Sequence, residues 1–212
     1  GCVWTHTSHC LDYLPNVRTG VEEDDTAVAF SVLGHDLGKA DTTATDATGR
    51  ITAYGHESAS VPLIRQFMLR MFNEGQPIID LVGKLVENHM RPVAIFNSSG
   101  SLPALRRCSV AVDGRLDLLM QVVSCDQSGR PPKPPNLEAV HWVKQKLSEA
   151  AISASQKIEP IIKGRHLIET FQLAPGPNFK PILDACYNAQ IDGKFTDLAG
   201  GLEYIKEQKL IC

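Results

Sequence analysis

The chain has 212 residues, of which 43% are hydrophobic and 21% are charged, and its formal net charge is −3 at pH 7. This length and composition are typical of an ordinary globular chain with one sizeable domain, or with one domain and an appendage. The acidic balance argues against nucleic-acid binding driven by bulk positive charge, although it leaves room for a local basic patch.

The cysteines and the hydropathy of the chain indicate its surroundings. The 6 cysteines show no C-x-x-C spacing, which argues against a zinc knuckle or a thioredoxin-type motif. We expect no signal peptide, and no apolar run in the sequence is long enough to span a bilayer. We therefore expect a reduced, cytoplasmic protein without membrane contacts. The chain enters its first helix without a polar leader, which suggests a fragment of a longer protein.

Apolar periodicity and helix-boundary residues predict an all-α chain with no strands and no internal repeat. We expect helices over residues 3–14, from Asp24 to about Gly34, from Ser58, from Pro77 to near His89, and over 102–108, 116–125, 137–152, about 178–190 and about 197–209. Residues 40–55 are rich in Thr, Asp, Ala and Gly, which is typical of a surface loop or connector.

A proline-rich stretch divides the predicted chain. Residues 129–135 read Gly-Arg-Pro-Pro-Lys-Pro-Pro and predict a stiff, extended link. The expected organisation is a domain over 1–130, a link over 131–136 and a helical tail over 137–212.

The most informative stretch is Gly34-His35-Asp36-Leu37-Gly38-Lys39, which follows an apolar helical run. The adjacent imidazole and carboxylate offer two ligand types for a divalent cation from one backbone turn. Burying this pair would be costly unless a metal ion or another partner compensates it. Gly34 and Gly38 allow close backbone approach or a sharp turn.

Further histidines and one aspartate lie at predicted helix ends or on helix faces: His6, His56, His89 and Asp126. Metal sites in helical proteins are built from such side chains facing a shared bundle interior. We therefore expect these residues to converge with His35 and Asp36 on one metal site. Three other histidines are expected outside it: His9 at the surface or behind the ligands, and His141 and His166 in solvent.

The order of these residues resembles a known family. His6, His35-Asp36 and Asp126 follow the H…HD…D pattern of the HD-domain metal-dependent phosphohydrolases, and His56 and His89 fall where a subset of that superfamily places two further metal-facing histidines. The sequence resembles one branch in more detail: the HD domain and C-terminal tail of bacterial tRNA nucleotidyltransferases. This resemblance is carried by residues 3–7 (VWTHT), 34–39 (GHDLGK), 55–57 (GHE), 126–130 (DQSGR), 162–165 (IKGR), 175–177 (PGP) and 189–193 (AQIDG).

The resemblance implies an HD-domain helical bundle with a C-terminal helical extension. It also implies a metal-dependent phosphohydrolase acting on phosphomonoesters or 2′,3′-cyclic phosphodiesters of nucleotides or tRNA 3′ ends. His35, Asp36 and Lys39 would be catalytic, and Lys39 and Arg130 would bind phosphate. The implied cofactor is a divalent metal (Ni, Co, Mn, Mg or Zn), and mixed imidazole and carboxylate ligands suit Mn, Fe, Co, Ni or Zn better than a Mg-only site.

The metal ligands in this reading are His6, His35, Asp36 and Asp126. His56 and His89 have two open roles. They could bind a second metal that shares Asp36 as a bridge, or they could contact phosphate and protonate the leaving group.

The sequence departs from that family in two places. It lacks the nucleotidyltransferase head, which could lie upstream in the native protein, and His166 stands where the family has an aspartate. Two rival functions remain: a non-catalytic HD domain, and an RNA-docking helical module in which Lys157, Lys163 and Arg165 contact tRNA.

Overall fold

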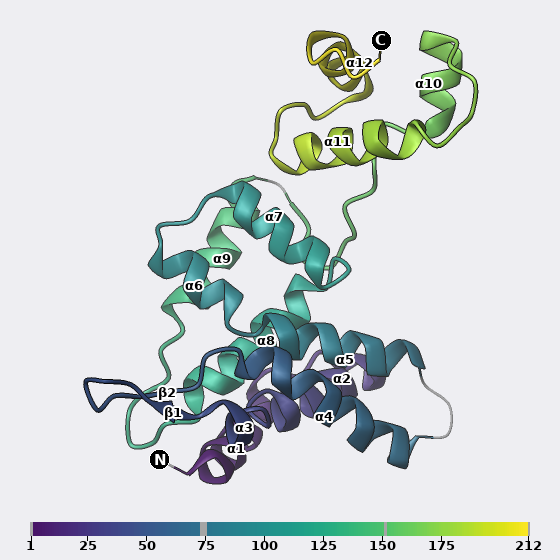
Figure 1. Ribbon diagram of the computed structural model, residues 1–212. Helices are drawn as coiled ribbons and strands as arrows, with labels where there is room; N and C mark the ends of the chain where they lie inside the picture. The colour runs from purple at the N-terminus through teal and green to yellow at the C-terminus, as the bar shows by residue number, and fades with distance from the viewer. Residues whose placement is uncertain (1, 73–75, 151, 212) are drawn as a thin grey trace. The chain divides into compact units, whose positions relative to one another are not determined.

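The computed structural model describes residues 2–72, 76–150 and 152–211. The chain forms two compact units, Gly1–Lys157 and Ile158–Cys212 (Figure 1). Helices make up most of both units, so the predicted all-α fold class is confirmed. Within the described ranges, none of the helices combines the length and the apolar character needed to cross a membrane.

Most elements belong to the first unit. They are α1 (Val3–Asp12), a 3-10 turn η1 (Leu14–Asn16), α2 (Glu22–Gly34), α3 (Lys39–Thr42), β1 (Ala44–Thr45), β2 (Ile51–Thr52), α4 (His56–Met71), α5 (Gln76–Asn88), α6 (Arg91–Asn97), α7 (Leu102–Ala111), α8 (Leu116–Ser128) and α9 (Glu138–Glu149). The second unit contains α10 (Gly164–Phe171), α11 (Phe179–Ile191) and α12 (Leu198–Glu207).

Helix α2 is the central element of the first unit, and it packs against α1, α4, α5 and α8. Its two sides pack in two different hydrophobic clusters. Ala27 joins a cluster with Ile64 and Met68 of α4, whereas Val28 and Val32 join the larger cluster built on α8. Because the helix is enclosed in this way, the residues at its C-terminal end are buried among its neighbours.

Several helix boundaries differ from the sequence prediction. Helix α2 begins at Glu22, because the Asp25 carboxylate accepts the backbone N–H of Thr19 at 2.7 Å and fixes the preceding turn. Helix α4 begins at His56 rather than Ser58. Helices α6 and α10 were not predicted at all. Pro92, which follows the helix predicted to end near His89, lies in the first turn of α6, where its missing N–H costs nothing.

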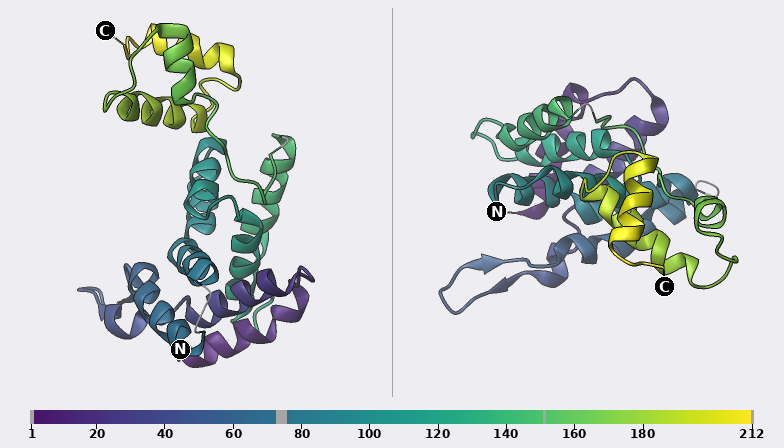
Figure 2. Two further views of the ribbon diagram at one scale, coloured as in Figure 1. Left: turned by 90° about the vertical axis from the view of Figure 1, so that its right-hand side faces the viewer. Right: turned by 90° about the horizontal axis from the view of Figure 1, so that it is seen from above.

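The expectation of a chain without strands is wrong at one place. Residues 40–55 contain α3 and a short antiparallel hairpin in which Ala44 pairs with Thr52 and Thr45 with Ile51. Its turn is closed by Asp46, whose carboxylate accepts the backbone N–H groups of Thr48 and Arg50 at 2.8 and 3.0 Å. Such local side-chain bonds are how aspartate stabilises turns. Figure 2 shows this hairpin standing out from the helices of the first unit.

The expected division of the chain at residues 131–136 is also displaced. Helix α9 follows the proline-rich stretch but packs against α6, α7 and α8. Its Val140, Val143 and Leu147 are buried in the same core as α8. The first unit therefore extends to Lys157, because the apolar face of α9 is covered by helices that precede the prolines.

Candidate metal centre

The predicted ligands come together at the C-terminal end of α2. His35 and Asp36 follow that helix, His6 lies on α1, His56 begins α4, His89 follows α5, and Asp126 lies in the last turn of α8. All are buried except His6, which is half-buried. The structure thus brings together residues that are up to 120 positions apart in the chain.

The first group of donors surrounds the Nε2 atom of His6. This atom lies 3.0 Å from Asp126 Oδ1 and 3.4 Å from His35 Nε2. His35 Nε2 in turn lies 3.6 Å from Asp126 Oδ1. One oxygen of Asp36, Oδ2, approaches the same group, at 3.4 Å from His35 Nε2 and 3.7 Å from His6 Nε2.

The second group lies on the other side of the Asp36 carboxylate. Its Oδ1 atom is 3.3 Å from His56 Nε2, which is 3.4 Å from His89 Nε2. Asp36 therefore stands between two sets of donors, one built on α1, α2 and α8 and the other on α4 and α5. Each of the two sets could hold a metal ion. The first consists of His6, Cys10, His35 and Asp126, and the second of Asp36, His56 and His89.

The four imidazoles are held in the same way. In each ring the Nδ1 atom donates a hydrogen bond to a backbone carbonyl: His6 to Gly129 (2.9 Å), His35 to Val32 (2.8 Å), His56 to Ala53 (2.8 Å) and His89 to Val86 (2.7 Å). A carbonyl oxygen can only accept, so the proton is on Nδ1 and Nε2 is left to face the site. Histidines that ligate metals are oriented by such second hydrogen bonds.

This arrangement fits a cation. When the rings are neutral, the Nε2 lone pairs of His6 and His35, and those of His56 and His89, face each other across 3.4 Å with no proton between them. A positive charge that both atoms of a pair can share removes that repulsion, and carboxylate oxygens complete both groups. The donor set of imidazole nitrogens and carboxylate oxygens is the one that transition metals and zinc use in proteins.

The carboxylates set the charge of the first group. A hydrogen bond to Asp126 raises the pKa of His6 to about 10. Burial on its own lowers the pKa of His35, but its hydrogen bonds to Asp126 and Asp36 outweigh burial and raise this pKa to about 9. In the metal-free protein, protons on Nε2 therefore supply the positive charge that the carboxylates require.

The pKa values of Asp36, Asp126 and His89 are also shifted by burial and by neighbouring charges. Burial raises the pKa of Asp36, but His35 and Lys39 outweigh it and hold this pKa well below its ordinary value. The pKa of Asp126 is likewise lowered, because its hydrogen bonds to His35 and His6 outweigh the effect of burial. His89 is the exception: burial, and then the charge of His35, lower its pKa to about 4. This imidazole is thus neutral at pH 7, the form in which histidine binds metal.

The turn after α2 is pressed against α4. A Cβ atom at Gly38 would lie 2.4 Å from the His56 carbonyl oxygen, and one at Gly34 would lie 2.6 Å from Ile64 Cγ1. The buried hydroxyl of Ser60 accepts the N–H of Gly38 at 2.8 Å and lies 2.9 and 2.7 Å from the carbonyl oxygens of His35 and His56. Ser60 thereby ties the two ligand-bearing segments together. Sequence reasoning missed it, because nothing distinguishes one helical serine from another.

Cys10 also escaped the sequence prediction, although it lies one helical turn after His6 on the same face of α1. Its Sγ atom is 3.5 Å from His6 Nε2 and 3.8 Å from His6 Nδ1. A sulfur that is nearly equidistant from both ring nitrogens lies against the face of the ring and not along a lone pair. We therefore interpret Cys10 as packing that holds the His6 ring, together with Gly129.

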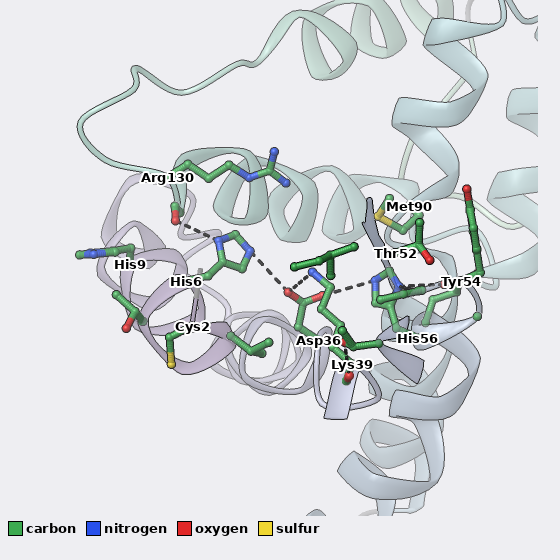
Figure 3. A pocket seen from close by; sticks show the side chains of 18 of the residues that line it. Cys2, His6, His9, Asp36, Lys39, Thr52, Tyr54, His56, Met90 and Arg130 are labelled. Atoms are coloured by element: carbon green, nitrogen blue, oxygen red, sulfur yellow. Dashed lines mark hydrogen bonds and ion pairs between the residues drawn. The ribbon is translucent and has the colours of Figure 1, made fainter. Parts of the chain in front are cut away.

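A pocket of about 1070 Å³ opens onto the donors. Figure 3 shows Arg130 beside His6 at one end, Thr52, Tyr54 and Met90 beside His56 at the other, and Asp36 and Lys39 between them. Three basic side chains line it: Lys39, Arg50 and Arg130. Lys39 Nζ is 2.6 Å from Asp36 Oδ2. Within the described residues, neither Arg50 nor Arg130 has an ion-pair partner.

The three histidines expected outside the centre do lie outside both donor groups. His9 has a side chain that is 40% exposed and lies 3.8 Å from Asp12. His141 is exposed, as predicted. The expectation that His166 is solvated is wrong: it is buried in the second unit, where its Nδ1 accepts the backbone N–H of Lys163 at 3.1 Å and caps α10.

Fold and site together define an all-α protein with a buried histidine and aspartate centre that could hold a divalent metal ion. Comparisons with protein-family models, curated proteins and solved structures gave no match to this chain.

Proposed function

We propose that this chain is a metal-dependent phosphohydrolase of the HD type, acting on phosphomonoesters or cyclic phosphodiesters of nucleotides or RNA ends. The observation that carries the proposal is the common orientation of four imidazoles, each with Nδ1 donating to a backbone carbonyl and with Nε2 turned toward another donor of the centre. Four imidazoles held in this way and two carboxylates, reached from a pocket with basic side chains through His6, Asp36 and His56, are suited to phosphate ester hydrolysis.

The chemistry of the bound metal is that of a Lewis acid: it lowers the pKa of a coordinated water, so that hydroxide is supplied at neutral pH. Mixed nitrogen and oxygen donors favour Mn, Fe, Co, Ni or Zn over a site for Mg alone. His6, His35, Asp36 and Asp126 would hold one ion. Asp36, His56 and His89 would hold a second one, with the Asp36 carboxylate shared.

The other residues of the pocket act on the phosphate. The Lys39 ammonium lies beside Asp36 and would neutralise a phosphoryl oxygen bound near the metal ligands. Arg130 carries a guanidinium without a partner among the described residues, and this group can hold a phosphate through two parallel hydrogen bonds. Both side chains orient the substrate and compensate the charge that develops in the transition state.

The test is hydrolysis of bis(p-nitrophenyl) phosphate and of 2′,3′-cyclic AMP by the full chain after it is loaded with Mn, Co, Ni or Zn. We expect activity that a chelator abolishes. Asp36→Asn should lower it by more than about 100-fold, because losing even an outer hydrogen-bond partner of such a centre costs about 10- to 100-fold. His141→Ala, an exposed histidine outside the centre, is the matched control.

A folded, metal-loaded protein that cleaves none of these esters with any of the four metals would overturn the proposal. The metal content of the same samples separates the two ways of failing. Protein that holds metal but is inactive would be a binding module, and protein that takes up no metal would lack the centre altogether.

A further inference from the structure

One end of the pocket is built by a tight turn that runs directly into a metal-facing histidine. The backbone N–H of His56 donates to the Ala53 carbonyl at 3.3 Å, and Gly55 has φ 78° and ψ 8°. These angles are those of the third residue of a type II turn, which requires a positive φ and therefore favours glycine. Tyr54 is the second residue of this turn.

The turn fixes Tyr54 relative to the centre. The carbonyl of Ala53, the residue before Tyr54, also accepts the Nδ1–H of His56 at 2.8 Å. The Ala53 carbonyl oxygen therefore holds both the His56 imidazole and the turn that contains Tyr54. The backbone of Tyr54 cannot move far without disturbing His56.

This end of the pocket differs in character from the other. Ile51, Tyr54 and Met90 line it while being 71%, 82% and 43% exposed. Large apolar side chains that remain exposed around a cleft are typical of binding sites. The opposite end carries Arg130 next to His6 (Figure 3). Exposed apolar and aromatic side chains thus gather beside His56, at the end where the hairpin also carries Arg50, whereas Arg130 lies beside His6.

We propose that Tyr54, at the end of the pocket that Met90 also lines, is the surface on which the planar base of a nucleotide substrate stacks, so that Tyr54 determines specificity for nucleotides over simple phosphate esters. This inference rests on the proposed function, because it places the phosphate on the metal ligands and Arg130. The base then points toward the hairpin end of the pocket.

A base fits this end better than an aliphatic group. Aromatic rings stack on tyrosine whatever their substituents, and the polarizable thioether of methionine also packs favourably against rings. The phenol offers a hydroxyl that can reach polar atoms at a base edge. Tyr54 is only two residues from His56, so one small molecule can touch both the ring and the metal ligands.

The experiment compares two phosphomonoesters of secondary alcohols: adenosine 2′-monophosphate, which carries a ribose ring and a base, and glycerol 2-phosphate, which carries neither. Base stacking on an aromatic side chain predicts that Tyr54→Ala raises KM for the adenosine ester by about 5- to 100-fold. Its kcat and both constants for the glycerol ester should stay within about twofold of the parent, since the phosphate contacts remain. Tyr54→Phe should restore KM, because the ring carries the effect.

Trp4→Ala is the matched control, because this aromatic side chain is 67% exposed on α1 and does not line the pocket. A readout independent of turnover is the Kd of adenosine 2′-monophosphate, measured by calorimetry on metal-loaded protein. It should weaken with Tyr54→Ala and not with Trp4→Ala.

Equal changes for both esters, or no change in KM and Kd for the adenosine ester, would overturn the role of Tyr54 while leaving the hydrolase proposal intact. If the parent cleaves neither ester and also leaves bis(p-nitrophenyl) phosphate and 2′,3′-cyclic AMP intact, the proposed function fails instead. The calorimetric comparison of parent and Tyr54→Ala then still decides whether Tyr54 binds the base.

Discussion

The carboxylate of Asp36 and the imidazole of His56 meet through Oδ1 and Nε2 at 3.3 Å, while the other carboxylate oxygen faces His35 at 3.4 Å. One side chain thus connects the donors of α1, α2 and α8 with those of α4 and α5. Two cations that share a carboxylate can stabilise both the attacking and the leaving oxygen of a displacement at phosphorus. The arrangement therefore predicts two metal ions per chain.

His89→Ala tests this stoichiometry. We expect the parent to bind two divalent ions per chain and the variant one, because the second position would keep only Asp36 and His56 as ligands. Equilibrium dialysis against Co or Mn, followed by elemental analysis, measures the ratio. His141→Ala should bind as the parent does. A parent that binds one ion, with no change in His89→Ala, would assign His56 and His89 to phosphate contacts instead.

The sequence predicted the fold class because apolar periodicity is strong in helices such as α5, α8 and α11. It missed the hairpin, since strands of 2 residues are too short to show alternation. It misplaced the division of the chain, because the prolines of 131–135 look like a linker whatever follows them. Only the packing of Val143 and its neighbours on α8 shows that α9 belongs to the first unit.

The candidate ligands could be chosen from the sequence because histidine and aspartate at the ends of apolar segments need partners. Their convergence, which the prediction required, is observed. The carbonyl partners of the four Nδ1 atoms, the tie through Ser60 and the Tyr54 turn could not be chosen, because backbone carbonyls and single serine or tyrosine residues carry no pattern. These features depend on tertiary contacts such as that between Gly38 and α4.

The pH dependence of folding in the metal-free protein has a defined sign. The pKa values of His6 and His35 are raised to about 10 and about 9, whereas an unfolded histidine titrates near 6.5. Their contribution to stability is complete below about pH 6.5 and is lost as the pH rises through these folded-state values. His89 acts in the opposite direction: its pKa is lowered to about 4, so stability falls as the pH drops below about 6.5.

We therefore expect the free energy of unfolding, measured by urea titration in the presence of a chelator, to be greatest near neutral or slightly acidic pH and to decline toward about pH 10. His6→Gln should flatten the alkaline decline, because glutamine does not titrate. A free energy of unfolding in the parent that stays constant from about pH 6.5 to 10 would contradict the ionisation of this pair.

Ser60→Ala tests the tie between the two ligand-bearing segments. The change leaves the buried N–H of Gly38 without its acceptor, which costs about 1–3 kcal/mol of stability. It should also weaken metal binding, because the turn after α2 loses its attachment to α4. Chemical denaturation and metal titration measure the two effects. Ser98→Ala, at an exposed serine, is the control, and equal behaviour of both variants would show that Ser60 does not position the ligands.

Gly129→Ala tests how closely the end of α8 must approach His6. The backbone of Gly129 has φ −77° and ψ 23°, which alanine tolerates, so any effect must come from space. Its Cβ would lie 2.3 Å from Cys10 Sγ and 2.7 Å from His6 Nδ1. The Gly129 carbonyl also accepts the Nδ1–H of His6, so a shift of this backbone turns the ring away from Asp126.

We expect Gly129→Ala to weaken metal binding by about 10- to 100-fold, as for the loss of an outer hydrogen-bond partner, and to destabilise the fold by about 1–3 kcal/mol through overpacking. Gly176→Ala is the control, since the nearest atom to its Cβ would be the Ala174 carbonyl oxygen at 3.9 Å. Isothermal titration with Co measures the effect on metal binding, and urea denaturation measures the effect on stability. If Gly129→Ala binds metal as tightly as Gly176→Ala, the His6 ring does not depend on this contact for its orientation.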